Sequence, residues 1–240
     1  MKKLLPFILI AIAACNTSKT DQFTIHGKIS GNASQKAYLN RYQEGKLSIV
    51  DSTAISENEF TFKGKVDFPD YYYIQIGESQ DYISLFVENS NITITAKTDS
   101  LDNAVIAGSS VQEKYNQYIN SKKEINAKID EIYQTYKTST DAQVKTLLAN
   151  RMDSLDMASI EMSKKYVKGN PSSVLAPFII SREIIYYLEL PELEELTNSI
   201  SPELANYHYT ISLKKRIELL KALQPGMVAP DFTQKDKDGN

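Results

Sequence analysis

The sequence has few of the residues that enzyme and metal chemistry most often require. It contains one cysteine, two histidines, no tryptophan and only nine glycines in 240 residues. A single thiol cannot form an internal disulfide, and no phosphate-binding glycine motif is present. His26 falls in an expected strand and His208 in an expected helix, without a nucleophile motif or metal-ligand spacing. The residues therefore predict no catalytic site, no metal site and no cofactor site.

A long basic segment is also lacking. Lys and Arg number 27 against 30 Asp and Glu, so the formal net charge is −3. Because nucleic-acid binding depends on neutralising many phosphates with basic side chains, no nucleic-acid partner is expected. Hydrophobic residues make up 42% of the chain and charged residues 24%, which is typical of globular domains with a core.

The N-terminus has the pattern of an export signal. Two lysines follow Met1, and the apolar run from Leu4 to Ala14 is well short of the roughly 20 residues that span a bilayer. We therefore expect residues 1–14 to be a signal peptide. The next residue, Cys15, follows Ile12-Ala13-Ala14, and this segment resembles the lipobox of bacterial lipoproteins.

The lipobox resemblance implies cleavage before Cys15 and attachment of acyl chains to its thiol. The chain would then be anchored to a membrane of the cell envelope by lipid, with residues 15–22 as a flexible tether. Asn16 is not the Asp that retains lipoproteins in the inner membrane of some bacteria, so we expect the outer membrane, on its periplasmic or surface side. The alternative is an ordinary secreted protein with a chance cysteine near its cleavage site.

Residues 23–109 alternate with a period of two. Their segments are rich in Ile, Val, Thr, Tyr and Phe and are separated by short turn sequences such as Gly31-Asn32 and Pro69-Asp70. Because connections this short do not allow parallel crossovers, neighbouring strands are expected to pair antiparallel. The pattern predicts an antiparallel β-sandwich or open barrel.

Residues 110–223 show helical spacing. Apolar residues from Val111 to Tyr136 recur at steps of three and four, interrupted only at Lys122, and predict one long helix. A second helix is expected over about 142–168, which predicts a long antiparallel helical hairpin. Further helices are expected over 172–188, over 191–199 and from Ser201 to about 223. The predicted fold class is α+β, with the β domain followed by an all-helical segment.

Tyr71-Tyr72-Tyr73 is the most conspicuous aromatic cluster. On a strand, Tyr71 and Tyr73 share one face and Tyr72 points to the other. Such a row could bind a sugar, a peptide or a partner protein by stacking. The alternative is that the three tyrosines belong to the core and rim of a small sheet.

The C-terminal residues resemble the opening of thioredoxin-fold proteins of the AhpC/TSA and TlpA-like class. The residues that carry this resemblance are 226–232, GMVAPDF, and the turn sequence DKDG at 236–239. In that class, G-x-x-A-P-x-F begins a β-hairpin and D-x-x-G supplies its turn. Residues 224–240 are therefore expected to be the truncated start of a thioredoxin-like domain.

The order of the preceding segments also resembles that of Bacteroidetes-type envelope thiol–disulfide oxidoreductases. In these proteins a lipobox precedes a β domain of the DUF4369 family and a helical region, which residues 170–176, NPSSVLA, also resemble. The family's redox-active C-x-x-C lies beyond the hairpin, whereas this sequence contains only Cys15. The expectation is a shortened, frameshifted or early-terminated gene product that is not an enzyme by itself.

The leading hypothesis is thus a membrane-anchored lipoprotein comprising the non-catalytic region of such an oxidoreductase. It would position a thioredoxin-like domain, form a dimer or recruit substrate for that domain. A homodimer or a protein partner would be held through the helical segment. The alternative is a stand-alone lipoprotein that binds a glycan, a peptide or a protein, with Tyr71, Tyr72 and Tyr73 as its possible binding surface.

Overall fold

A computed structural model describes residues 20–31, 36–43 and 45–227 of the chain. The expected signal peptide, Cys15 and all but residues 224–227 of the expected thioredoxin-like start lie outside these ranges. The chain divides into two compact units, one of residues 1–67 and 71–109 and one of residues 68–70 and 110–240. Each unit has its own elements and is described by itself.

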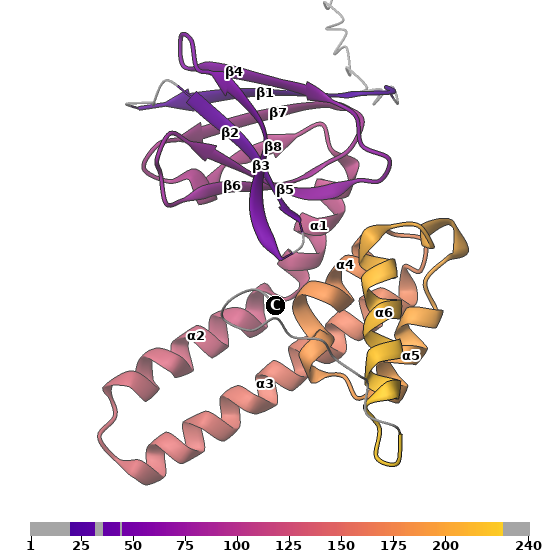
Figure 1. Cartoon of the computed structure of the whole chain (residues 1–240). Coiled ribbons are helices and arrows are strands. Elements are labelled where there is room, and N and C mark those ends of the chain that lie inside the picture. Colours follow the sequence, from indigo (N-terminus) through magenta and orange to yellow (C-terminus); the bar gives the residue numbers. More distant parts are fainter. Residues whose placement is uncertain (1–19, 32–35, 44, 228–240) are drawn as a thin grey trace, which may run out of the picture. The chain divides into compact units, whose positions relative to one another are not determined.

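The first unit is built from two four-stranded sheets, with strand orders β4-β1-β7-β8 and β3-β2-β5-β6 (Figure 1). The two sheets do not close into a barrel. The eight strands in the described ranges are β1 (Phe23–Ser30), β2 (Lys36–Gln43), β3 (Lys46–Ala54), β4 (Glu59–Gly64), β5 (Asp70–Ile76), β6 (Tyr82–Val87), β7 (Asn91–Lys97) and β8 (Val105–Ala107).

Alternation along the strands builds the core of this unit. In β7 every second residue is buried, and β1 and β5 follow the same rule. The inward-facing side chains of both sheets meet in one hydrophobic cluster, to which Ile25 and Ile92 contribute from one sheet and Ile74 and Leu85 from the other. The period-two pattern of the sequence thus becomes the shared core of two packed sheets.

One strand pair departs from the expected antiparallel pairing. β1 and β7 run parallel, with Thr24 opposite Asn91 and Ser30 opposite Lys97. The antiparallel expectation applies to consecutive strands joined by short connections. β1 and β7 are instead joined by the whole of β2 to β6, which is long enough for the chain to return in the same direction. The pairs β1–β4, β2–β3, β2–β5 and β7–β8 are antiparallel as expected.

Gly108 closes the first unit after β8 in a conformation that favours glycine. Its φ is +88°, and a Cβ atom at this position would lie 2.0 Å from the carbonyl oxygen of Asn91. The chain therefore passes close to the backbone of β7 before the helices begin. Next to it, Ser90 Oγ donates a hydrogen bond of 2.7 Å to the Gly108 carbonyl.

The second unit contains six α-helices in the described residues (Figure 1). They are α1 (Ser110–Ser121), α2 (Lys123–Thr138), α3 (Ala142–Gly169), α4 (Leu175–Ile179), α5 (Leu190–Asn198) and α6 (His208–Ala222). The fold class is therefore α+β, as predicted.

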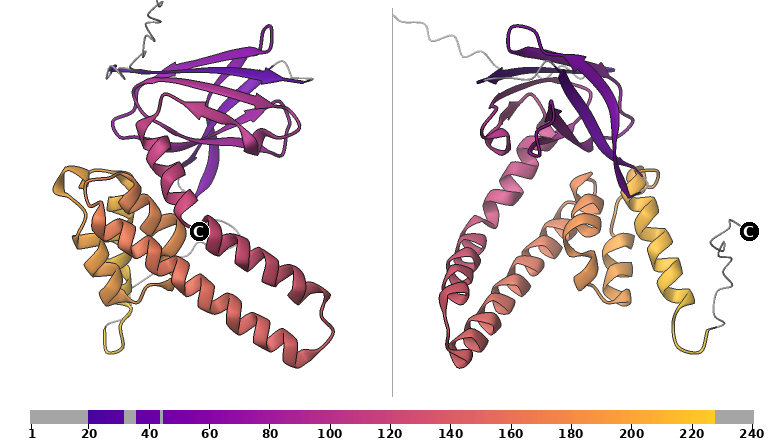
Figure 2. Two further views of the ribbon diagram at one scale, coloured as in Figure 1. Left: turned by 180° about the vertical axis from the view of Figure 1, so that it is seen from behind. Right: turned by 60° about the vertical axis from the view of Figure 1, so that its left-hand side comes forward.

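The predicted helical hairpin is confirmed, with α2 and α3 as its two antiparallel arms (Figure 2). Asp141 caps α3, because its carboxylate accepts hydrogen bonds from the backbone of Gln143 and Val144. Buried residues of α3 lie in its C-terminal half, from Ser159 onward, where α4 and α5 pack against the helix.

Three of the expected helices have different limits in the structure. The helix expected from Val111 to Tyr136 is two helices, because the chain turns at Lys122, the position where the apolar stripe is interrupted. The segment 172–188 is divided into three elements: α4 (Leu175–Ile179), a π-helical turn (Ile180–Ile184) and a 3₁₀ turn (Ile185–Tyr187). The last helix begins at His208 rather than near Ser201, since Pro202–Leu204 forms only a separate 3₁₀ turn.

Candidate functional site

The three adjacent tyrosines of β5 alternate as the sequence predicts. Tyr72 is 6% exposed and belongs to the core of the first unit, while Tyr71 and Tyr73 lie on the opposite face of the sheet and are half-buried. The ring centroids of Tyr71 and Tyr73 are 5.2 Å apart in an edge-to-face arrangement. Tyr72 is thus a core residue, and Tyr71 and Tyr73 are the members of the cluster on the outer face.

The outer face of this sheet carries further aromatic side chains. Tyr42 of β2 lies 5.8 Å from Tyr73, and Tyr82 of β6 lies 6.2 Å from Tyr73, measured between ring centroids. Tyr71 contacts the buried Phe86 at 4.9 Å. Edge-to-face contacts of this kind orient the rings relative to one another. We call Tyr42, Tyr71, Tyr73 and Tyr82 the tyrosine row.

A second group of polar side chains lies inside the helical unit. Tyr118 of α1 donates a hydrogen bond of 2.5 Å to Glu183 Oε2 and lies 2.8 Å from Ser163 Oγ. Lys122 Nζ donates to the same three groups, at 3.3 Å to Tyr118, 3.0 Å to Ser163 and 3.3 Å to Glu183. An ammonium group has three N–H donors, so every donor of Lys122 is used.

The hydroxyl groups of this polar network are shielded from water, whereas Lys122 and Glu183 remain partly exposed. Tyr118 is 2% exposed and Ser163 is fully buried. Burial, followed by the hydrogen bond to Glu183, raises the pKa of Tyr118 well above its usual value. The phenol therefore stays protonated at physiological pH and continues to donate its hydrogen bond.

A serine next to a lysine invites comparison with nucleophilic catalysis, but the surroundings of Ser163 argue for a structural role. A nucleophile must be reached by its substrate, and Ser163 has no exposed surface. Its hydroxyl also donates to the Ser159 carbonyl at 3.0 Å, in addition to the contacts with Tyr118 and Lys122. The network is best described as an internal connection between α1, α3 and the π-helical turn.

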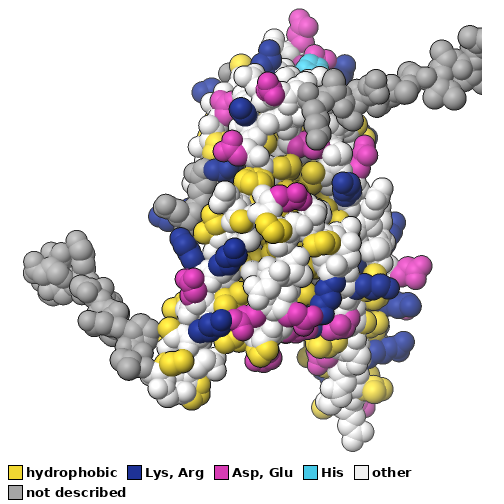
Figure 3. Space-filling model, turned by 90° about the vertical axis from the view of Figure 1, so that its right-hand side faces the viewer, with side chains coloured by type: hydrophobic (Ala, Val, Ile, Leu, Met, Phe, Trp, Pro, Cys, Tyr) yellow, Lys and Arg dark blue, Asp and Glu magenta, His cyan; other side chains and the backbone are white. Residues whose placement is uncertain are grey.

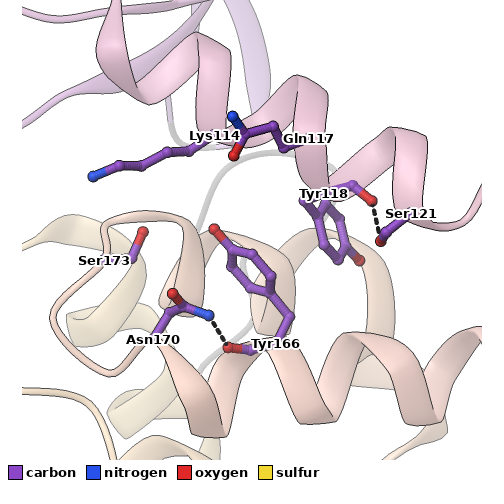
Figure 4. Close-up of a pocket in the computed structure, with 7 residues that line it drawn as sticks. All are labelled: Lys114, Gln117, Tyr118, Ser121, Tyr166, Asn170 and Ser173. Carbon is purple, nitrogen blue, oxygen red and sulfur yellow. Dashed lines mark hydrogen bonds between the residues drawn. The ribbon is translucent and has the colours of Figure 1, made fainter.

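A pocket of about 350 Å³ opens beside the network, between α1 and the C-terminal end of α3 (Figure 4). We call it the helical pocket. Its lining is polar except for the aromatic rings and consists of Lys114, Gln117, Tyr118, Ser121, Tyr166, Asn170 and Ser173.

Hydrogen bonds fix several of these side chains. Asn170 Nδ2 donates to the Tyr166 carbonyl at 2.8 Å, and Ser121 Oγ donates to the Tyr118 carbonyl at 2.6 Å. The rings of Tyr118 and Tyr166 pack together with centroids 4.8 Å apart. Burial raises the pKa of Tyr166, although its hydrogen bond to Ser173 opposes the shift, so this phenol is also neutral at physiological pH.

Lys164 forms a separate cluster of charges in the helical unit. This lysine is mostly buried, and its Nζ lies 2.8 Å from Glu161 Oε1 and 2.5 Å from Glu192 Oε1. Burial alone would lower the pKa of Lys164, but the two carboxylates outweigh it and raise that pKa above its ordinary value. The cluster joins α3 to α5.

The two histidines occupy different settings. His26 lies on the exposed side of β1, where Nδ1 is 3.3 Å from Thr61 Oγ1 and Nε2 is 3.5 Å from Glu59. His208 begins α6, and its Nε2 lies 3.0 Å from Asp70 Oδ2, a residue assigned to the same unit. Neither histidine lines the helical pocket.

Two observations concern other kinds of site within the described part of the chain. No three His, Cys, Asp or Glu side chains come together there in a way that could hold a metal ion. No helix of residues 20–31, 36–43 and 45–227 is both long and apolar enough to cross a membrane. On the face shown in Figure 3, Lys and Arg side chains are interspersed with Asp and Glu side chains.

The sequence predicts the alternation of the β5 tyrosines, but it predicts neither the polar network nor the helical pocket. The one available signal is Lys122, which interrupts an apolar stripe. A lysine on the inward side of a helix predicts a buried partner, although it does not identify that partner.

Comparison with known families assigns the first part of the chain. Residues 23–115 match the model of a family described as Domain of unknown function (DUF4369). A DUF4369 domain therefore extends from the start of β1 into α1, in agreement with the expected β domain of this family. No curated protein and no solved structure gives a significant match to the chain.

Proposed function

We propose that the chain is a membrane-anchored envelope lipoprotein comprising the non-catalytic N-terminal region of a TlpA-like thiol–disulfide oxidoreductase. The observation that carries the proposal is the order of three features in one chain. A DUF4369 domain at residues 23–115 is followed by a helical unit, and then by the GMVAPDF segment at 226–232 that resembles the start of thioredoxin-like domains.

In this proposal the chain contributes binding and position rather than electron transfer. Disulfide exchange by a C-x-x-C site requires one thiolate to attack and a second thiol to resolve the mixed disulfide. Cys15 is the only cysteine in the sequence and is the proposed site of lipid attachment. The redox thiols belong to a thioredoxin-like domain, whether in the same polypeptide or in a partner.

Reduction of insulin by dithiothreitol, with and without the purified chain, tests the redox part of the proposal. We expect the chain to give no acceleration, while a TlpA-like thioredoxin domain used as the positive control accelerates the reaction. The same redox domain joined after residue 240 is then compared with the free domain on envelope protein substrates, where a rate gain indicates recruitment. Acceleration by the isolated chain that survives Cys15→Ser would contradict the proposal.

The tyrosine row favours a second candidate function, binding of a glycan, peptide or partner protein by a stand-alone lipoprotein. Aromatic rings offer large contact areas at low entropic cost, and those of the row are oriented by edge-to-face contacts. Glycan arrays and pull-down experiments with Tyr71→Ala plus Tyr73→Ala test this function. Tyr186→Ala plus Tyr187→Ala is the matched control, since these two tyrosines are 86% and 60% exposed in the helical unit.

Binding that is lost in the first double variant and kept in the second, with unchanged circular dichroism, would support the second function. Equal binding by both double variants would remove it.

The leading proposal also includes self-association of the chain through its helical segment. The hairpin presents Tyr133, Val144 and Leu147 as exposed large hydrophobic side chains near its tip. Burial of such side chains against a partner lowers the free energy of the complex. Sedimentation velocity of the wild type and Leu147→Glu tests this part, with a weaker dimer expected for the variant.

A further inference from the structure

The side chains that line the helical pocket are suited to bind a small molecule. Such binding would not depend on the proposed redox role. We propose that the helical pocket binds a small neutral polyhydroxylated ligand, a monosaccharide or disaccharide. Its volume of about 350 Å³ is at the lower end of the range of about 300–1,000 Å³ found for ligand pockets. Three properties of the lining support such a ligand: its hydrogen-bonding groups, its charge and its rigidity.

The lining offers hydrogen-bond donors and acceptors together. Asn170 uses its amide nitrogen on the Tyr166 carbonyl, which leaves the amide oxygen as an acceptor. Ser121 donates to the Tyr118 carbonyl and can still accept. The Ser173 hydroxyl accepts from the Leu175 amide at 3.2 Å and is hydrogen-bonded to Tyr166. A sugar hydroxyl is both donor and acceptor, so it can pair with either kind of group.

Gln117 and the phenol of Tyr166 extend this mixed pattern across the pocket. Figure 4 shows the Gln117 amide on the α1 side and the Tyr166 hydroxyl pointing toward α1 from the opposite wall. A glutamine amide provides two donors and an acceptor at one position. Polar groups on two facing elements thus line the space that one compact ligand with several hydroxyls would occupy.

The charge of the pocket favours a neutral ligand. No Asp or Glu lines it, so nothing in the lining would compensate a cationic ligand. Lys114 is the one charged residue of the lining, and Figure 4 shows its ammonium group extended away from Tyr118. The C-terminal ends of α1 and α3 lie at the pocket, at Ser121 and Gly169, and their partial negative charge disfavours an anion.

The floor of the pocket is held in place before any ligand binds. Tyr118 is fixed by Ser163, Lys122 and Glu183, and its ring packs on that of Tyr166. A side chain that is already ordered loses little entropy when a ligand contacts it. Apart from Tyr118, the members of the buried polar network thereby support the lining without lining the pocket themselves.

Amide chemical-shift mapping of the full ¹⁵N-labelled chain tests the proposal. The probes are glucose, galactose, N-acetylglucosamine and cellobiose, with galacturonate as the charged counterpart of galactose. We expect saturable shifts around residues 114–121 and 166–173 with at least one neutral sugar. Gln117→Ala should weaken that binding about threefold to tenfold, because one neutral hydrogen bond is lost. Gln134→Ala, an exposed glutamine of α2, is the matched control and should leave the affinity unchanged.

Three results would overturn the proposal. The first is the absence of saturable shifts at the helical pocket with all four neutral sugars. The second is equal weakening by Gln117→Ala and Gln134→Ala. The third is preference for galacturonate over galactose that disappears in Lys114→Gln, which would identify an anion site instead. None of these results depends on the insulin assay, so the saccharide proposal and the proposed redox role can fail separately.

Discussion

At the scale of the residue, Lys122 connects three elements of the helical unit. It ends the helical register of α1, and its ammonium group donates to side chains of α1, α3 and the π-helical turn. Lys122 and Glu183 retain only 12% and 22% of their side-chain exposure. Removing one partner from such a pair leaves the other poorly compensated, which costs more than losing a surface ion pair.

We therefore predict that Lys122→Ala lowers the free energy of unfolding by about 2–3 kcal/mol. The neighbouring Lys123 is exposed and begins α2, so Lys123→Ala should change stability by less than about 0.5 kcal/mol. Urea denaturation followed by circular dichroism measures both. Equal effects of the two substitutions would show that the network contributes little.

Lys164 gives a prediction about pH. Its pKa is raised in the folded state above the ordinary value of 10.5, so its contribution to stability is complete below about pH 10.5 and is lost as the pH rises through the folded-state pKa. The difference in unfolding free energy between wild type and Lys164→Met should be constant from pH 7 to 10. Above that range the wild type should lose stability relative to the variant.

The control for this pH profile is Lys165→Met, since Lys165 is the exposed neighbour of Lys164 on α3. Its difference from wild type should not vary over the same range. A wild-type advantage over Lys164→Met that already declines between pH 7 and 9 would contradict the assignment.

Residues whose environment depends on local periodicity are predictable from the sequence. Tyr71, Tyr72 and Tyr73 alternate between the outer face and the core because successive side chains of any strand do so. The members of the polar network could not be assembled in this way. Ser163 and Glu183 lie 45 and 65 positions after Tyr118, and only tertiary packing brings the three together.

At the scale of the element, the helical hairpin was predictable because each arm carries an apolar stripe over many turns and Asp141 supplies a cap. The parallel pairing of β1 with β7 was not predictable, because period-two alternation fixes which face a residue occupies and says nothing of which strand is its neighbour. The helical pocket was not predictable either, because local periodicity does not show that α1 and the end of α3 are neighbours in the folded chain.

The turn after β8 supplies the prediction at this scale. Gly108→Ala should destabilise the protein by about 2–4 kcal/mol, because the positive φ is strained for alanine and the added Cβ would meet the Asn91 carbonyl. Gly169→Ala is the matched control, since a Cβ there meets nothing within 4 Å and alanine has a higher helix propensity than glycine. Thermal denaturation should show a lower Tm for the first variant and an unchanged or higher Tm for the second. The opposite order would contradict the strand–turn geometry.

At the scale of the whole molecule, the proposed anchoring to the cell envelope can be tested directly. Attachment of acyl chains to Cys15 would hold the protein on a membrane with about 0.8 kcal/mol for each buried methylene group. We predict that the wild-type chain, expressed in a bacterial host with an alkynyl palmitate analogue, is labelled and partitions into the detergent phase of Triton X-114. Cys15→Ser should abolish both properties. A wild-type chain that is exported but unlabelled would show that Cys15 is not lipidated.

The parallel pairing of β1 with β7 also determines the order in which the strand pairs can form while the chain is synthesised from its N-terminus. β1 leaves the ribosome first but pairs with β4 and β7, whose residues begin at Glu59 and Asn91. β2 and β3 are consecutive and can form their hairpin as soon as they emerge. The first sheet must therefore wait for most of the domain to be synthesised, and contacts so distant in sequence slow folding. For that interval β1 presents an unpaired edge, so export in an unfolded state, or a chaperone that covers this strand, would protect the nascent domain from aggregation.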